Sequence, residues 1–217
     1  MALIILDAGS GNTCKNDGNY IKKMIDELVK VDTGKHEVVI KWQLFRDAPP
    51  NTRLDYYSFD FAYKYAKSKG YKTTASVFDK RSLSYLLHFD IPFVKIANRP
   101  DLYWLAGEVP RKIPVYTSVG VKGKTVWVTN DWINTDIETL ACVSEYPATF
   151  QQYEEKFGSD LGYTSLLYRA ISDHTTNFDL WHKYSPKIIE WHYKLADSTG
   201  LDAGEFARTP EQLKAIL

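Results

Sequence analysis

The hydrophobic positions of this chain fall into short continuous runs, separated by longer polar or amphipathic stretches. Runs rich in Val, Ile, Leu and Ala without polar alternation are typical of parallel strands that are buried on both faces. The pattern predicts strands at 3–8, 37–42, 73–77, 92–97, 113–118, 138–143, 166–171 and 187–191.

The stretches between these runs show helical spacing. Residues 20–31 place their apolar side chains on one face of a helix, and residues 56–67 and 81–89 repeat the pattern. Near the C-terminus, Thr209 is a suitable N-cap and Pro210 suits the first helical position, so we predict that a helix begins there.

Eight predicted strands with helices between them favour a closed (β/α)8 TIM barrel, with a doubly wound open sheet as the alternative. The interval 119–128 carries glycines and β-branched residues where a barrel would place its fifth helix, so we expect a loop or a small hairpin there. The chain shows no repeats or linkers, and we predict a single barrel domain over residues 1–217.

Composition and charge exclude several classes of protein. With 27 basic and 27 acidic residues, the net charge is zero and the cations are scattered, which argues against a nucleic-acid partner. No apolar run approaches the roughly 20 residues that span a bilayer, and the apolar opening ends at Asp7, as a first strand would rather than a signal peptide. Cys14 and Cys142 suggest no disulfide framework, so we expect a reducing cytoplasm and no membrane partner.

Two histidines stand at the ends of consecutive predicted strands. His174 follows the run 166–171, and His192 follows the run 187–191. Ligands of parallel α/β proteins bind at these strand ends, where two imidazoles could share one divalent metal, with water and substrate oxygens completing its coordination. Taken singly, His174 is also explained by a local turn and His192 by a satisfied core position. If the metal is bound, its affinity should fall below pH about 6.5, because ligating imidazole must be neutral.

Two lysines interrupt apolar strands. Lys41 and Lys95 each lie near the end of a predicted strand, where a buried ammonium is costly unless it is paired or faces a polar site. Each lysine alone could extend its ammonium to water, but two at equivalent strand ends favour a site for phosphate or carboxylate. Hydroxyl groups at other strand ends would complete this site: Ser76, Ser118, Ser144 and Ser172.

Three carboxylates are candidates for acid or metal chemistry. Glu190 and Asp202 could act near the metal or orient an imidazole from behind. Asp7 ends the first strand, and its alternative role is an Asx turn into Gly9.

In this order, these pieces resemble the sialic acid synthase (N-acetylneuraminate synthase) family. Residues 39–43 are similar to the family's V-K-x-Q strand. The most specific similarities are C-V-S-E-Y-P at 142–147 and S-D-H-T at 172–175. The segments 189–193 and 200–202 resemble the family's E-K-H-F and G-P-D segments.

The resemblance implies a metal-dependent condensation of phosphoenolpyruvate with an aldose such as N-acetylmannosamine. The product would be a sialic-acid-type 2-keto-3-deoxy sugar acid, with release of phosphate. The resemblance implies Mn²⁺ or Mg²⁺ at His174 and His192, and leaves a homodimer open as the assembly. It implies catalytic roles for Lys41, Asp7 and Glu190, and substrate contacts from Lys41, Gln43, Ser76, Lys95, Asn98, Ser118, Ser144, Ser172 and Asp202.

The sequence also departs from the family pattern. Asp7 stands in place of a glutamate and Thr13 in place of a histidine, while Asn98 replaces a serine and Asp101 is the nearest substitute for a displaced acidic residue. The family's C-terminal antifreeze-like domain is expected to be missing. Two other functions therefore stay open. One is a repurposed or non-catalytic barrel that binds an acidic or phosphorylated small molecule or serves as a subunit of a larger assembly, and the other is a metal-assisted aldolase or isomerase.

Overall fold

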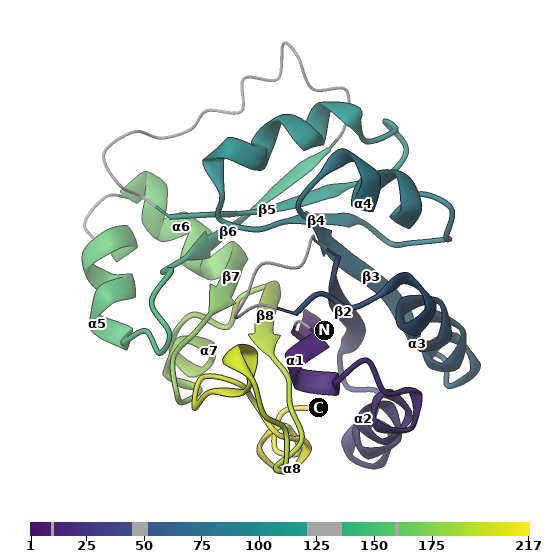
Figure 1. Cartoon of the computed structure of the whole chain (residues 1–217). Coiled ribbons are helices and arrows are strands. Elements are labelled where there is room, and N and C mark those ends of the chain that lie inside the picture. The colour runs from purple at the N-terminus through teal and green to yellow at the C-terminus, as the bar shows by residue number, and fades with distance from the viewer. Residues whose placement is uncertain (10, 45–51, 121–135, 159–160) are drawn as a thin grey trace.

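The computed structural model describes residues 1–9, 11–44, 52–120, 136–158 and 161–217. Within these residues, eight parallel strands form a closed barrel, in which each strand pairs with its neighbours in sequence and β8 pairs with β1 (Figure 1). This closure confirms the predicted TIM barrel and excludes the open sheet. The strands are β1 (Leu3–Asp7), β2 (Glu37–Leu44), β3 (Lys72–Val77), β4 (Val94–Ile96), β5 (Val115–Val119), β6 (Ile137–Cys142), β7 (Ala170–Asp173) and β8 (Ile188–His192).

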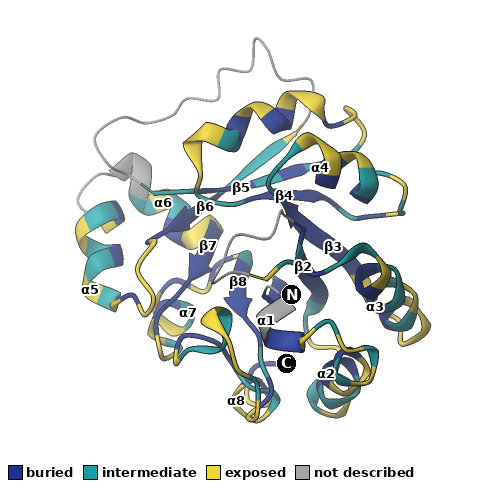
Figure 2. Cartoon of the chain, viewed as in Figure 1, coloured by how far each residue is buried: buried dark blue, intermediate teal, exposed yellow. Residues whose placement is uncertain are grey.

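Helices surround the barrel and turn their buried faces toward the strands (Figures 1 and 2). None of the helices in the described ranges is long and apolar enough to cross a membrane. They are α1 (Gly11–Cys14), α2 (Gly18–Val31), α3 (Tyr56–Ser68), α4 (Lys80–Leu86), α5 (Phe150–Tyr153), α6 (Leu161–Arg169), α7 (Asp179–Tyr184) and α8 (Pro210–Leu213), with the 3₁₀ helices η1 (Pro100–Glu108) and η3 (Leu201–Ala203) and the π-helical turn η2 (Glu154–Gly158).

Side-chain caps explain where several helices begin. Asp55 accepts a hydrogen bond from the backbone of Ser58 at the start of α3, and so satisfies a donor that has no partner within the helix. At α8, Thr209 and Gln212 form a reciprocal capping box and Pro210 takes the first helical position. The predicted helix start at Thr209 is therefore confirmed, as are the helices predicted at 20–31 and 56–67.

Two predicted boundaries are wrong. The strand predicted at 166–171 begins only at Ala170, because 166–169 form the last part of α6, where Leu167 is buried against the core. A short apolar run without alternation suits a buried strand and a buried helical turn equally well. The helix predicted at 81–89 ends at Leu86.

The loop or hairpin predicted at 119–128 falls mostly on residues outside the described ranges. Val119 ends β5, and the residues 121–135 that follow Gly120 are not described. That part of the prediction stays a prediction.

The barrel interior changes from apolar to polar along its axis. Ile5, Val39 and Phe93 form a buried cluster inside the barrel, and the Phe93 ring stacks on Tyr116 with ring centroids 4.1 Å apart. Side chains two positions further along a strand point to the same side of the sheet. The interior positions that follow this apolar layer are polar: Asp7, Lys41, Lys95 and Ser118.

Replacing the stacked ring should test this apolar layer. We expect Phe93→Ala to lower the free energy of unfolding by about 3–5 kcal/mol, because a buried aromatic side chain and its contacts are lost. Urea denaturation measures the change. The control is Trp104→Ala on η1, because Trp104 is 54% exposed and its replacement should change stability by less than about 0.5 kcal/mol. Equal effects of the two variants would show that the layer does not stabilise the barrel.

Candidate active site

A cavity of about 400 Å³ opens at the carboxyl ends of the strands. Every residue that the sequence analysis assigned to catalysis, substrate binding or metal binding lines it. These residues are Asp7, Lys41, Gln43, Ser76, Lys95, Asn98, Ser118, Ser144, Ser172, His174, Glu190, His192 and Asp202. The structure therefore confirms that they lie together, while their chemical roles stay predictions.

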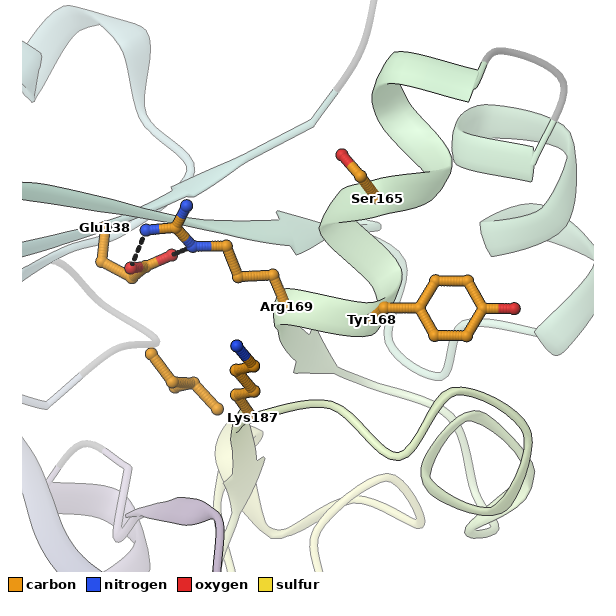
Figure 3. Close-up of a pocket in the computed structure, with 6 residues that line it drawn as sticks. Glu138, Ser165, Tyr168, Arg169 and Lys187 are labelled. Atoms are coloured by element: carbon orange, nitrogen blue, oxygen red, sulfur yellow. Dashed lines mark hydrogen bonds and ion pairs between the residues drawn. The ribbon is translucent and has the colours of Figure 1, made fainter.

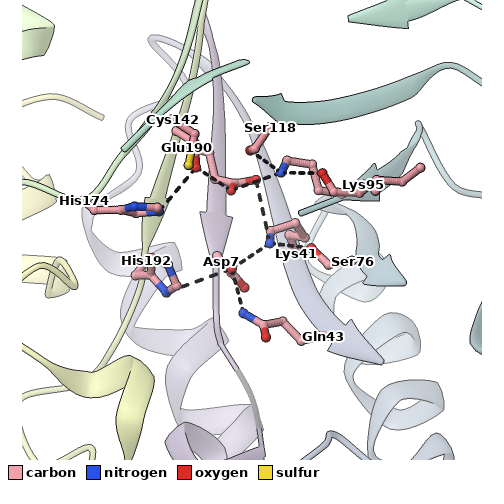
Figure 4. Close-up of polar contacts among 12 residues, drawn as sticks. Asp7, Lys41, Gln43, Ser76, Lys95, Ser118, Cys142, His174, Glu190 and His192 are labelled. Atoms are coloured by element: carbon pink, nitrogen blue, oxygen red, sulfur yellow. Dashed lines mark hydrogen bonds and ion pairs between the residues drawn. The ribbon is translucent and has the colours of Figure 1, made fainter. Parts of the chain in front are cut away.

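Lys41 is held by two carboxylates and a hydroxyl group (Figure 4). Its Nζ donates to Asp7 Oδ2 at 2.6 Å and to Ser76 Oγ at 2.8 Å, and lies 3.7 Å from Glu190 Oε2. Burial lowers the pKa of Lys41, but the carboxylates of Asp7 and Glu190 outweigh it and raise the pKa above its ordinary value. For Asp7 the effect of burial is opposite, because burial raises the pKa of a carboxyl group. The charges of Lys41 and His192 outweigh burial and lower the pKa of Asp7 to about 2. Lys41 and Asp7 are therefore a charged pair at neutral pH.

The two oxygens of Asp7 serve different partners. Oδ2 accepts hydrogen bonds from Lys41 and, at 3.0 Å, from Gln43 Nε2. Oδ1 accepts a hydrogen bond from the N–H of Gly9 at 3.0 Å. The Asx turn that the sequence offered as an alternative role is thus present beside the contact with Lys41. Gly9 has a φ of +71°, and a Cβ added there would lie 2.7 Å from Cβ of Asp202. Glycine therefore lets the segment that carries Asp202 approach the cavity.

Glu190 lies between the two lysines. Its Oε1 lies 3.5 Å from Nζ of Lys95 and accepts a hydrogen bond from Ser172 Oγ at 2.9 Å. Lys95 also donates to Ser118 Oγ at 2.7 Å. Burial raises the pKa of Glu190, but the two lysines lower it below its ordinary value, so Glu190 is a carboxylate. Burial lowers the pKa of Lys95, although Glu190 opposes the shift.

The two imidazole rings are neighbours, with centroids 5.3 Å apart. Nδ1 of His174 lies 2.7 Å from the carbonyl oxygen of Val143. Because a carbonyl only accepts, Nδ1 carries the proton and Nε2 keeps its lone pair. Nδ1 of His192 is buried without a hydrogen-bond partner, 4.0 Å from Asp7 Oδ2 and 3.9 Å from Asp202 Oδ1.

Burial, with a smaller contribution from His192, lowers the pKa of His174 to about 3. His174 is therefore neutral at neutral pH, in the form that binds metals. The pH dependence expected for metal binding stays a prediction.

The described part of the chain contains no cluster of three or more His, Cys, Asp or Glu side chains suited to a metal ion. His174 and His192 are neighbouring side chains of the cavity whose ring nitrogens could hold a metal, with water or substrate oxygens completing its coordination.

Asn98 connects three loops at the cavity rim. Its Nδ2 donates to Ser144 Oγ at 2.8 Å, and its Oδ1 accepts the N–H of Gly120 at 2.9 Å. Asp101, the expected substitute for the displaced acidic residue, instead binds Arg99 through two hydrogen bonds of 2.9 and 2.7 Å and does not line the cavity. Asn98 thus orients Ser144, and Asp101 orients Arg99.

Five lining residues were not assigned by sequence: Phe78, Ala97, Arg99, Cys142 and Tyr146. Tyr146 covers His174 with ring centroids 4.3 Å apart. Cys142 and Tyr146 belong to the C-V-S-E-Y-P segment, so its resemblance was a signal that could have identified them. Burial raises the pKa of Cys142 to about 11, so its thiol is protonated at neutral pH.

The fold and the site define a TIM barrel with a charged cavity at the carboxyl ends of its strands. The sequence matches the NeuB family over residues 42–217, and the chain belongs to that family. No curated protein sequence matches it.

Several solved structures share the barrel fold. The N-acetylneuraminic acid synthetase of Leptospira borgpetersenii, solved with citrate, has a TM-score of 0.76 at 20% identity, covering 98% of this chain and 80% of that chain. Spore coat polysaccharide biosynthesis protein E of Chromobacterium violaceum has a TM-score of 0.78 at 19% identity, covering 99% and 72%. The DAHP synthase of Thermotoga maritima has a TM-score of 0.64 at 13% identity, covering 99% and 66%. At these identities the likeness establishes the fold.

The Asp7–Lys41 pair gives a test that depends on pH. Asp7→Asn should lower the free energy of unfolding at neutral pH by about 3 kcal/mol or more, because the buried ammonium loses its closest carboxylate. The pKa of Asp7 is lowered from 3.8 to about 2, so its stabilising effect is present above pH 3.8 and is lost as the pH falls through 2. The difference between wild type and variant should therefore shrink over this range.

Urea denaturation at a series of pH values measures this difference. The control is Asp60→Asn, which removes an exposed ion pair with Lys64 and should have little effect. A difference for Asp7→Asn that stays constant from neutral pH to pH about 2 would contradict the assignment of Asp7 as the charged partner.

Proposed function

We propose that this chain condenses phosphoenolpyruvate with an aldose to give a sialic-acid-type 2-keto-3-deoxy sugar acid and inorganic phosphate. Membership in the NeuB family supports a synthase-type role in general. The observation that carries the finer proposal is the composition of the cavity, which combines two buried ammonium groups with two neighbouring imidazoles.

The lysine side of the cavity suits the donor. Phosphoenolpyruvate carries a carboxylate and a phosphate, and Lys41 and Lys95 offer two fixed cations for them. Hydroxyl groups beside the cations would add neutral donors, since Ser76 contacts Lys41 and Ser118 contacts Lys95. Charge-assisted hydrogen bonds of this kind are worth about 1.5–3 kcal/mol each.

The histidine side suits a divalent metal. His174 keeps a lone pair on Nε2, and His192 has a buried nitrogen that no protein group satisfies. We propose that these two residues hold Mn²⁺ or Mg²⁺. When bound, such an ion would polarise the aldehyde oxygen of the open-chain aldose.

The remaining residues would act on the reactants through position and charge. The enol carbon of the donor attacks the aldehyde carbon, water adds to the resulting cation, and phosphate leaves with cleavage of its C–O bond. The aldehyde oxygen becomes a hydroxyl group by taking one proton of the added water, and the second proton leaves with phosphate as the keto group forms. Glu190 and Asp7, which the lysines hold as carboxylates, would provide negative charge beside a donor that becomes cationic. The lysines would hold the donor still while the second reactant approaches.

Phosphate release from phosphoenolpyruvate, measured with Mn²⁺ and a panel of aldoses, tests the reaction. Release that depends on an aldose supports the synthase. Binding of phosphoenolpyruvate without release would instead support a barrel that binds an acidic molecule without turnover. Aldol cleavage or isomerisation of the sugar alone would support the third class.

Neutralising the lysines should weaken donor binding. We expect Lys95→Met to raise the Kd of phosphoenolpyruvate about tenfold or more, because the aliphatic stem stays packed while the charge is lost. Lys41→Met is combined with Asp7→Asn, because Lys41 donates to that carboxylate and its loss would leave the buried charge without this partner. Isothermal titration calorimetry measures the Kd. Lys64→Met, at an exposed position, is the control and should leave it unchanged. Wild-type affinity in both lysine variants would place the donor elsewhere.

Removing the imidazoles should abolish metal binding. His174→Ala and His192→Ala, singly and together, should eliminate tight Mn²⁺ binding in calorimetry, since no third protein ligand is proposed to compensate. His182→Ala on α7 is the matched control, because His182 is exposed and outside the cavity lining. Retention of tight binding in the double variant would show that the ion binds at other residues.

A further inference from the structure

Arg208 is a buried cation that lies outside the cavity lining, between η3 and α8. Its side chain is 0% exposed, and its guanidinium lies over the ring of Phe178 at 4.9 Å. The guanidinium donates to the backbone carbonyls of Phe206 and Asn177 and forms an ion pair with Asp173 at 3.6 Å. Burying a charge is costly even when it is paired, and apolar side chains often stabilise such a position equally well. Packing alone therefore does not account for Arg208.

Its partner Asp173 ties the ends of two strands together. Asp173 and Trp191 are the last residue pair in the β7–β8 register, and Trp191 Nε1 donates to Asp173 Oδ2 at 2.8 Å. The next residues along the chain are His174, directly after β7, and His192, the last residue of β8. Because side chains alternate along a strand, this bond on the outer face fixes the strands at the point where both imidazoles face the cavity.

The backbone of Arg208 also holds the end of β8. Its N–H donates to the carbonyl oxygen of His192 at 2.7 Å, and a parallel bridge pairs Arg208 with Tyr193. Its Nη2 lies 3.5 Å from Oγ1 of Thr175, which follows His174 in sequence. Arg208 therefore contacts the segment that carries His174 through its side chain and the segment that carries His192 through its backbone.

We propose that Arg208 is a positioning residue, which acts through Asp173 and the backbone of His192 to fix the separation and orientation of the two imidazole rings. The proposed effect of Arg208 on the two imidazole rings follows from its contacts with Asp173 and with the backbone of His192. The consequence for a metal rests on the proposed function, and groups behind metal ligands typically change affinity by about 10–100-fold when they are replaced.

Two variants test the proposal. Arg208→Met combined with Asp173→Asn removes both charges, so neither is left buried without a partner. The new amide oxygen can still accept from Trp191, while the amide nitrogen replaces the oxygen that accepts the N–H of Thr175. Arg208→Lys keeps the cation but loses the planar fork that serves two carbonyl groups. Thermal denaturation of each variant shows that it is folded before binding is measured.

Two readouts separate positioning from general stability. Nitrogen-15 spectra of the imidazole rings, recorded on metal-free protein, should show shifted or broadened signals for His174 and His192 in the double variant. Calorimetry should show a Kd for Mn²⁺ that rises about tenfold or more, with Arg208→Lys between the double variant and wild type. The Kd of phosphoenolpyruvate without metal should change less than about twofold, because Lys41 and Lys95 lie on β2 and β4.

The matched control is Arg169→Met. Arg169 pairs with Glu138 at 2.6 Å beside a pocket of about 540 Å³ near the starts of β6 and β8, at the other end of the barrel (Figure 3). It should change neither the ring signals nor the Kd of Mn²⁺.

Unchanged ring signals and an unchanged Kd in the double variant would overturn the role of Arg208 and leave the proposed function standing. Wild-type protein that binds no Mn²⁺ would overturn the metal in the proposed function. The ring signals of the metal-free protein would then still decide whether Arg208 positions the histidines.

Discussion

The pairing of two buried lysines with Glu190 is the interaction on which the site depends. The side chains of Lys41 and Lys95 are each 2% exposed, and an ammonium with so little exposed surface is costly unless it is paired with negative charge. Glu190 lies 3.7 Å from one lysine and 3.5 Å from the other, and Asp7 takes a second position on Lys41. These groups come from β1, β2, β4 and β8, so they meet only because the sheet closes into a barrel.

Along the barrel axis, an apolar layer that packs the interior is followed by the polar layer that lines the cavity. Near the strand starts, the stacked rings of Phe93 and Tyr116 fill the interior with apolar contacts. Two residues further along the same strands, Lys95 and Ser118 form a hydrogen bond within the charged cavity. Neighbouring layers of the barrel interior are thus apolar packing and polar cavity lining, because every second side chain of a strand points to the same face of the sheet.

The end of the β7–β8 ladder uses both of its faces. The inner face presents His174 and His192 to the cavity, while the outer face carries the Asp173–Trp191 hydrogen bond and the buried guanidinium of Arg208. A ring that must meet a ligand at a defined distance needs a rigid backbone behind it. The outer face supplies this rigidity without placing further charges in the cavity.

The sequence by itself determined the eight strands in their order, the helices α2, α3, α4 and α8, and most of the cavity lining, because polar residues that follow apolar runs lie together once parallel strands close. It misplaced 166–169, because Leu167 has the same apolar character in a helical turn as in a strand. Only the tertiary structure decided that Glu190 bridges both lysines, that the carbonyl of Val143 sets the protonated nitrogen of His174, and that Arg208 is buried. These facts depend on distances between residues far apart in the chain, and those distances are fixed by strand register and barrel closure rather than by any local pattern.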